Sequence, residues 1–256
     1  MKKLCLIVLV TITVLVGGCA KSSTQDQTDQ VSTKTNKQGP KPPKEVVLKY
    51  EAEPAVSVEI ASPLKGMAQI KSLPIESAGR KLTLELWAGA DVQNKGGALQ
   101  GYLTDGGKTY NLGPLGPYMA TNKYEVKPQD INADGVSDLL VSIDAGGSAM
   151  ESNIFTYDSA GANWVKVLNA PDFVFKDLDG DGKEEVMGIT RKVDPEKLWL
   201  YKEENGAWGK ADIVALSKQY YAKLVQNQDE AKLQLGQDPK KPYTYVLKDD
   251  KLVLTD

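Results

Sequence analysis

Two short stretches decide which fold this sequence encodes. Residues 130–138 read DINADGVSD, and residues 177–185 read DLDGDGKEE. Both follow the pattern D-x-[DN]-x-D-G-x-x-[DE], and the second stretch begins 47 positions after the first. A pattern that recurs at a fixed distance indicates a chain built from repeated supersecondary units.

The match continues downstream of the two stretches. Ile154–Tyr157 matches Leu198–Tyr201 at an offset of 44, and Trp164 matches Trp208 at the same offset. Each unit is therefore predicted to run strand, Asp loop, strand, variable loop, aromatic strand, turn and Trp strand. The change from 47 to 44 predicts a three-residue deletion in one loop. Because both tryptophans lie at strand spacing, we expect them in the core rather than on a ligand surface.

Period-two alternation predicts that the rest of the chain is also rich in strands. Val56–Ile60 and Leu82–Leu86 alternate between apolar and polar residues, which is typical of half-buried strands. Leu82–Gly89 and Gly101–Tyr110 together resemble a degenerate earlier unit without an Asp loop. Further strand-like runs are residues 138–143, 154–157, 185–189, 198–201, 243–246 and 251–254.

One stretch departs from the strand pattern. Within Asp212–Leu233, four apolar or aromatic residues fall at helical spacing, namely Ile213, Leu216, Tyr220 and Leu224. One short helix near the C-terminus is therefore expected.

The two Asp-rich stretches, here called loop one (130–138) and loop two (177–185), carry the residue types that calcium requires. Calcium takes about six to eight oxygen ligands, and side chains at positions 1, 3 and 5 of a tight loop can converge on one ion. Glycine at position 6 permits the sharp turn. Position 7 offers its carbonyl oxygen, and the carboxylate at position 9 closes the site. The predicted ligands are Asp130, Asn132, Asp134, Val136 and Asp138 in loop one, and Asp177, Asp179, Asp181, Lys183 and Glu185 in loop two.

The predicted calcium ion has a structural role, since it neutralises carboxylates that otherwise repel one another. Loop two offers four carboxylates and loop one offers three, so loop two is expected to bind more tightly. The alternative for either loop is an Asp/Asn-Gly turn that holds no ion.

The loops are not EF-hands, because position 12 is Val141 or Gly188 where that motif needs a bidentate Glu. Over roughly residues 120–215 the chain instead resembles the FG-GAP/VCBS-type repeats of integrin α-chain propellers and bacterial surface proteins. The resemblance implies blade-like β units with calcium in a hairpin loop. The phenylalanine-glycine and glycine-alanine-proline signatures of that family are not evident. A closed propeller needs at least about four blades. We therefore expect a mainly β fold with two to three antiparallel blade-like units, not a closed propeller, whose core the N-terminal strands complete.

The N-terminus has the features of an export signal. Met1–Lys3 is positive, and Leu4–Val16 is an apolar run too short to span a bilayer. The following Val-Gly-Gly-Cys resembles the lipobox of bacterial lipoproteins, which implies removal of residues 1–18 and lipidation of Cys19. A plain secretory signal is the alternative. Residues 20–44 are polar and rich in Lys, Thr and Pro, so they are predicted to form a disordered tether.

Composition excludes several functions. The chain has no histidine, so Ser-His-Asp triads, Cys-His dyads and imidazole zinc sites are excluded. Its only cysteines are Cys5, in the predicted signal, and Cys19, so the mature domain is expected to have no thiol chemistry. The net charge of −3 does not favour a nucleic-acid partner.

These patterns predict three parts of the folded domain: an N-terminal β region at 45–120, two calcium-loop repeats at 121–215 and a C-terminal helix and strand region at 216–256. The predicted protein is a non-enzymatic binding or adhesion module on the outer face of the bacterial cytoplasmic membrane. Its expected partner is a protein or a cell-wall glycan. The alternative is an extracellular hydrolase, or its accessory subunit, acting on cell-wall or other carbohydrate. An enzyme of that kind needs two carboxylates outside the loops, about 5–10 Å apart across a pocket.

Overall fold

The computed structural model describes residues 41–77, 79–89, 97–132, 134–144, 146, 150–190, 193–226 and 231–255. The chain divides into two compact units, Met1–Gln38 and Gly39–Asp256, and all of these residues belong to the second. The predictions for the signal segment, for Cys19 and for most of the tether lie outside the described residues. No helix in the described part has the length and apolar character needed to cross a bilayer.

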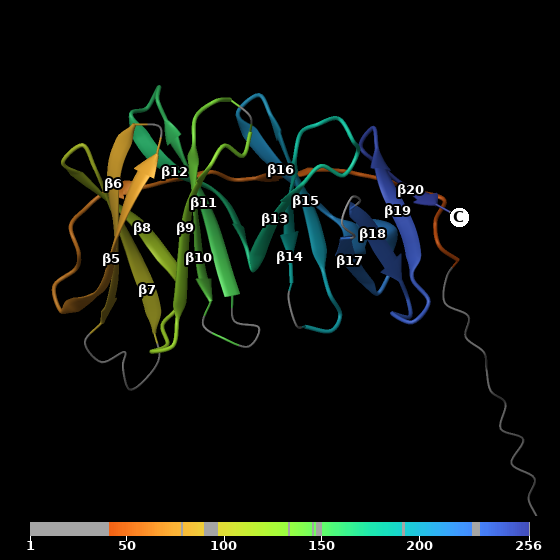
Figure 1. Ribbon diagram of the computed structural model, residues 1–256, viewed down its shortest axis with the longest axis horizontal. Coiled ribbons are helices and arrows are strands. Elements are labelled where there is room, and N and C mark those ends of the chain that lie inside the picture. The colour runs from red at the N-terminus through yellow and green to blue at the C-terminus, as the bar shows by residue number, and fades with distance from the viewer. Residues whose placement is uncertain are drawn as a thin grey trace, which may run out of the picture. The chain divides into compact units, whose positions relative to one another are not determined.

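Four antiparallel sheets of five strands each form the described part of the second unit (Figure 1). The mainly β fold and its antiparallel, non-closed arrangement are as predicted, but the number of sheets is four rather than two to three. Each sheet consists of four strands that are consecutive in the chain, plus a fifth strand from the N-terminal segment.

The consecutive strands are named here by sheet. The first sheet has β5 (Met67–Ser77), β6 (Arg80–Gly89), β7 (Ala98–Asp105) and β8 (Lys108–Pro117). The second has β9 (Lys123–Gln129), β10 (Asp138–Asp144), β11 (Met150–Asp158) and β12 (Asn163–Ala170). The third has β13 (Asp172–Lys176), β14 (Glu185–Ile189), β15 (Leu198–Glu204) and β16 (Ala207–Asp212). The fourth has β17 (Tyr221–Gln226), β18 (Ala231–Gly236), β19 (Tyr243–Lys248) and β20 (Lys251–Thr255).

The segment 45–60, which we call the strap, supplies the fifth strand of every sheet. Its strands are β1 (Glu45–Val47), β2 (Glu51–Glu53), β3 (Val56–Ser57) and β4 (Glu59–Ile60). They pair in turn with β20, β16, β12 and β8, which are the last strands of the fourth, third, second and first sheets. The strap therefore passes along the sheets in the reverse of chain order (Figure 1).

The prediction of one half-buried strand at Val56–Ile60 was wrong. The segment divides between two sheets, and only Val58 is buried, at 5% exposure, whereas Val56 and Ile60 are 52% and 61% exposed. Val58 lies at the crossing between the second and first sheets and donates its N–H to the Trp164 carbonyl. Alternation in the sequence could not reveal this crossing, because it does not show which sheet a residue joins.

Apolar side chains from neighbouring sheets form three buried clusters. One joins the first and second sheets and includes Leu84, Phe155 and Trp164. The next joins the second and third sheets and includes Trp208. The last joins the third and fourth sheets. Trp164 and Trp208 are 2% and 7% exposed, which confirms that both belong to the core.

The predicted repeat corresponds to the second and third sheets, but its internal offset differs. Leu139 pairs with Phe155, and the equivalent Val186 pairs with Tyr201, so the third strands of the two sheets are related by an offset of 46 rather than 44. The remaining two-residue difference lies in the following hairpin turn. The prediction of a single three-residue deletion was therefore wrong, since length changes in two loops cannot be separated by matching aromatic residues alone.

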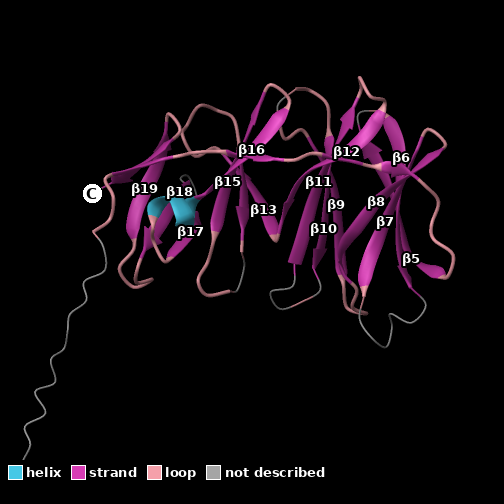
Figure 2. Cartoon of the chain, turned by 180° about the vertical axis from the view of Figure 1, so that it is seen from behind, coloured by secondary structure: helices cyan, strands magenta, loops and turns pink. Residues whose placement is uncertain are grey.

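The predicted short helix near the C-terminus is present, but most of the stretch that was expected to be helical forms strands. Helix α2 covers only Ile213–Ser217 (Figure 2), and Asp212 caps it by accepting a 2.9 Å hydrogen bond from the Ala215 N–H. It ends at Lys218, whose φ of 56° is left-handed. Leu224 lies in β17 opposite Leu233 of β18. The helical spacing was misleading because Ile213, Leu216 and Leu224 contact one core from two consecutive elements, whereas Tyr220 is 46% exposed.

Candidate metal centre

The two Asp loops occupy the same position in neighbouring sheets. Loop one joins β9 to β10, and loop two joins β13 to β14, so each connects the first two strands of its sheet. The residue at position 2 of each loop, Ile131 or Leu178, is 8% exposed and packs into a core cluster. The loops are therefore anchored to the fold at one apolar residue, while their acidic residues, except the buried Asp138, remain near the surface.

Both loops share a set of hydrogen bonds from backbone N–H groups to carboxylates. The glycine at position 6 donates to the carboxylate at position 1, position 7 donates to position 5, and position 2 donates to position 9. In loop one the N···O distances are 2.9 Å from Gly135 to Asp130, 2.7 Å from Val136 to Asp134 and 3.1 Å from Ile131 to Asp138. In loop two they are 3.0 Å from Gly182 to Asp177, 2.7 Å from Lys183 to Asp181 and 2.6 Å from Leu178 to Glu185.

Glycine at position 6 is required by this geometry. Gly135 and Gly182 have φ values of 83° and 87°, a region that side chains with a Cβ rarely adopt. The prediction that position 6 needs glycine for a sharp turn is therefore confirmed. Backbone N–H groups of the same loop hold the carboxylates at positions 1 and 9.

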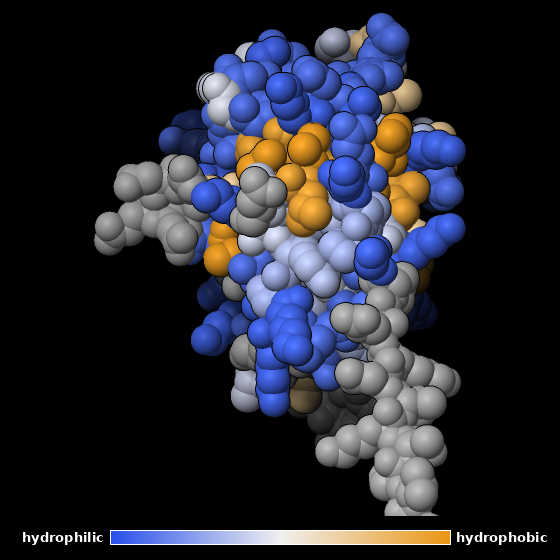
Figure 3. Space-filling view, turned by 90° about the vertical axis from the view of Figure 1, so that its right-hand side faces the viewer, coloured by the Kyte–Doolittle hydropathy of each residue, from blue (hydrophilic) through white to orange (hydrophobic). Residues whose placement is uncertain are grey.

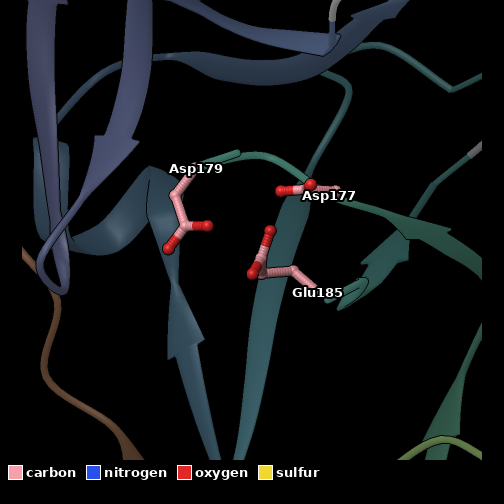
Figure 4. Close-up of side chains that lie close together, drawn as sticks. All are labelled: Asp177, Asp179 and Glu185. Atoms are coloured by element: carbon pink, nitrogen blue, oxygen red, sulfur yellow. The ribbon is translucent and has the colours of Figure 1, made fainter. Parts of the chain in front are cut away.

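Loop two brings three carboxylates together. Oxygen atoms of Asp177, Asp179 and Glu185 all lie within 4.8 Å of one another, and their side chains converge in Figure 4. Such a cluster could hold a metal ion, because carboxylate oxygens are the ligands preferred by hard divalent cations. The structure thus brings together three of the five residues predicted for this loop.

Loop one forms no comparable cluster among the described residues. Asp138, at position 9, is only 2% exposed, and both of its carboxylate oxygens accept hydrogen bonds. One accepts from the Ile131 N–H, and the other accepts from the Thr156 hydroxyl of β11 at 2.6 Å. Residue Ala133 of this loop lies outside the described residues.

The remaining predicted ligands make hydrogen bonds within the loops. In loop one the Asn132 amide donates to Asp134 at 3.1 Å, so these two side chains bond to each other. In loop two Asp181 accepts from the Lys183 N–H and is not part of the three-carboxylate cluster. Val136 and Lys183, expected to offer carbonyl oxygens, donate their N–H groups within the turns, and their carbonyls stay predicted ligands.

The pKa values of the two position-9 carboxylates, Glu185 and Asp138, are both raised. Partial burial, together with the charges of Asp179, Asp177 and Asp181, raises the pKa of Glu185 to about 7, against the opposing hydrogen bond from the Leu178 N–H. Burial also raises the pKa of Asp138 to about 6, although the hydrogen bonds from Thr156 and Ile131 favour its ionised form. A cation at loop two would stabilise the ionised form of Glu185.

Sequence reasoning missed two features of this site. The apolar residue at position 2, present in both loops, could have been read as an anchor. The Thr156 hydroxyl lies 18 residues from Asp138 on another strand, so no local pattern indicated it.

A cavity of about 520 Å³ lies between the two loops, with Asp130 of loop one and Asp181 of loop two on its wall.

Comparisons with known proteins identify no relative. No protein-family model matches the chain, and no curated protein matches it significantly.

Proposed function

We propose that this protein is a membrane-anchored extracytoplasmic lipoprotein whose four-sheet unit is a calcium-stabilised, non-enzymatic binding or adhesion module. The observation that carries the calcium part is the convergence of Asp177, Asp179 and Glu185 in a glycine-containing hairpin loop. The lipobox-like segment that ends at Cys19 and the polar tether support the anchor. A protein or a cell-wall glycan remains the proposed partner.

Calcium is favoured over softer transition metals by the donor set. The three clustered groups are all carboxylates, and no histidine or unmodified thiol is expected nearby, so softer transition metals lack their preferred ligands. Bringing three carboxylates within 4.8 Å of one another raises their mutual repulsion, which a bound divalent ion relieves. Binding to the folded loop alone would therefore stabilise the fold.

The test is a thermal melt with calcium and with chelator. A chain that begins at Ala20 keeps every described residue and lacks the predicted signal and Cys19. With a dissociation constant of about 10⁻³–10⁻⁴ M, typical of extracellular modules, calcium at about 10 mM would add roughly 1.4–2.7 kcal/mol to the free energy of unfolding. We expect Tm to rise by several degrees.

A matched pair of variants locates the ion. Asp177→Asn and Asp130→Asn change position 1 of loop two and of loop one, and each asparagine can still accept one backbone hydrogen bond. The calcium-dependent rise in Tm should be lost in the first variant and kept in the second. If Asp130→Asn alone removes the rise, loop two is not the principal site.

The anchor is tested separately in cells. Incorporation of labelled fatty acid and its loss in Cys19→Ala would support lipidation, and unlabelled wild-type protein would contradict it.

The cavities near the Asp loops do not favour the hydrolase alternative. Three of the cavities in the described part of the chain lie near the loops and the fourth sheet. Outside loops one and two, their walls carry one carboxylate at most, Glu196 in one cavity and Glu203 in another. A glycosidase of the usual kind needs a facing pair.

A further inference from the structure

The cavity between loops one and two, which we call the inter-loop cavity, is formed by residues of two neighbouring sheets. Loop one and the end of β9 contribute one part of its wall, and loop two with strands of the third sheet contributes the rest. Its volume of about 520 Å³ falls within the range of about 300–1,000 Å³ that is typical of small-ligand pockets. The inter-loop cavity can therefore hold a group larger than a metal ion.

Aromatic side chains form the base of the inter-loop cavity. Tyr201 and Trp208 line it although they are only 5% and 7% exposed, and Phe175, which also lines it, is half-buried. The Tyr201 hydroxyl donates a 3.3 Å hydrogen bond to the Asn169 carbonyl, which fixes the position of the ring. The faces of aromatic rings attract organic cations.

The rest of the wall carries an excess of negative charge. Five carboxylates line the cavity against two lysines, Lys183 and Lys202. Lys202 is already paired with Asp250 at 2.7 Å and with Glu204 at 3.0 Å, and neither of these partners lines the cavity. Within the described residues, none of the five carboxylates makes an ion pair. The five are Asp130, Asp181, Glu184, Glu185 and Glu203.

The inter-loop cavity adjoins the candidate metal centre, because Glu185 belongs to both. With Glu185 bound to the proposed calcium ion, four carboxylates would still line the cavity. Glu184 and Glu203 accept hydrogen bonds from neutral groups, namely the Gln129 amide at 3.5 Å and the Gly206 N–H. An organic cation that enters the cavity would therefore meet both negative charge and aromatic surface.

An arginine side chain matches this combination better than a lysine side chain does. The planar guanidinium group stacks on aromatic rings and pairs with carboxylates through two parallel hydrogen bonds. The lysine ammonium is a compact and strongly hydrated charge, so it gains less from an aromatic base.

We propose that the inter-loop cavity receives an arginine side chain of a partner protein. This proposal rests on the proposed binding function and names the chemistry of its partner. Charge complementarity selects the occupant of this cavity. By contrast, the apolar patch surrounded by hydrophilic residues at the fourth-sheet end of the unit (Figure 3) indicates no particular partner, because aliphatic side chains carry no charge to match.

The experiment titrates the isotope-labelled chain that begins at Ala20 with the blocked tetrapeptide Gly-Arg-Arg-Gly, at one fixed free calcium concentration. NMR shifts of the Gly182 amide and the Trp208 indole N–H measure binding. We expect saturable binding that weakens with added salt. The same peptide with citrulline at both arginines keeps the shape but loses the charge, so it should bind at least about tenfold more weakly. The tetrapeptide Gly-Lys-Lys-Gly should also bind more weakly.

A matched pair of double variants locates the site. Glu184→Gln with Glu203→Gln removes two charges from the wall, and each glutamine can still accept the existing hydrogen bond. This variant should bind the arginine peptide about tenfold more weakly and keep the calcium-dependent rise in Tm. The control, Glu59→Gln with Glu76→Gln, removes two exposed carboxylates of the first sheet and should leave binding unchanged.

Several outcomes would overturn the proposal. They are equal weakening by both double variants, equal binding of the arginine and citrulline peptides, and no saturable binding at all. Equal binding of the lysine peptide, or unchanged binding in Phe175→Leu, would contradict recognition of a guanidinium group on an aromatic base. Tighter binding of an N-acetylglucosamine tetramer than of the arginine peptide would indicate a glycan partner instead.

The outcomes separate this proposal from the proposed function. Asp177 does not line the inter-loop cavity, so Asp177→Asn should lose the calcium-dependent rise in Tm and still bind the arginine peptide. A wild-type chain that shows this rise but binds no peptide would retain the calcium site and overturn the arginine site alone.

Discussion

Asp138 and Glu185 show how one position of a repeated loop serves two purposes. Both accept a hydrogen bond from the N–H at position 2. Asp138 is short, almost fully buried and bonded to Thr156 as well, whereas the longer Glu185 reaches Asp177 and Asp179. Closure of loop one therefore depends on protein hydrogen bonds, while closure of loop two gathers negative charge that a cation can neutralise.

This difference predicts distinct effects of two substitutions. Asp138→Ala leaves the Ile131 N–H and the Thr156 hydroxyl without their acceptor and should lower the free energy of unfolding by about 1–3 kcal/mol, with calcium or with chelator. Glu185→Gln should remove the calcium-dependent rise in Tm. Thermal melts under both conditions measure the two effects. A calcium-dependent loss in Asp138→Ala would show that loop one also binds the ion.

The raised pKa of Glu185 predicts a pH dependence. With a pKa of about 7 in the folded chain against an ordinary value of 4.5, the metal-free folded state binds more protons than the unfolded state between these values. The stability contributed by protonated Glu185 is therefore complete below about pH 4.5 and is lost as the pH rises through about 7. Asp138, with a pKa of about 6, contributes in the same direction.

The proposed calcium ion would compete with the proton on Glu185, so its effect on Tm should be larger at about pH 8 than at about pH 6. Melts at both pH values, with calcium and with chelator, measure the difference. Glu185→Gln is the control and should show no calcium effect at either pH. An equal calcium effect at both pH values in the wild type would argue against Glu185 as a ligand.

At the scale of elements, the strap has little secondary structure of its own but touches every sheet. Its pairings cover only two or three residues each, so backbone hydrogen bonds contribute little at any one sheet. Buried apolar side chains hold it in place: Val46 lies within the β1 pairing, and Leu48 and Val58 lie between paired segments.

Two valines of the strap provide a matched test of this anchoring. Val58→Ala removes buried methyl groups from the cluster between the first and second sheets and should cost about 1–3 kcal/mol of unfolding free energy. Val56→Ala, two residues earlier and 52% exposed, should change it by less than about 0.5 kcal/mol. Chemical denaturation of both variants measures the difference. Equal costs would mean that the strap is held by its backbone pairings.

At the scale of the whole molecule, the strap joins elements that are far apart in sequence. Val46 pairs with Leu252, and Val56 pairs with Lys166. Without the strap, β8, β12, β16 and β20 would each have an unpaired edge, which is a template for association with other chains.

A chain that begins at Ser62 is therefore expected to melt at a lower temperature and to form higher-order species, as measured by size-exclusion chromatography. The chain that begins at Ala20 is the control and should elute as a single species. A strapless chain with an unchanged Tm and a single elution peak would show that the sheets are held by their packed faces alone.

Several features could be predicted from the sequence because they depend on neighbouring residues. The alternation at Leu82–Leu86 matches a strand whose three leucines are at most 2% exposed. The Asp loops lie between strands, as the repeat predicted. The fourth sheet was only partly anticipated, because β19 and β20 were expected while β17 was assigned to a helix.

The sequence by itself therefore determined the strand-rich character, the repeated unit and the oxygen-rich loops, since period-two alternation and ligand spacing are local properties. Only the tertiary structure decided which loop gathers its carboxylates, since Thr156 comes from a different strand. It also decided that the strap completes all four sheets and that Pro43 and Lys44 bond to strands of the fourth sheet. These features depend on contacts between residues as far apart as Pro43 and Tyr245, and no local pattern specifies them.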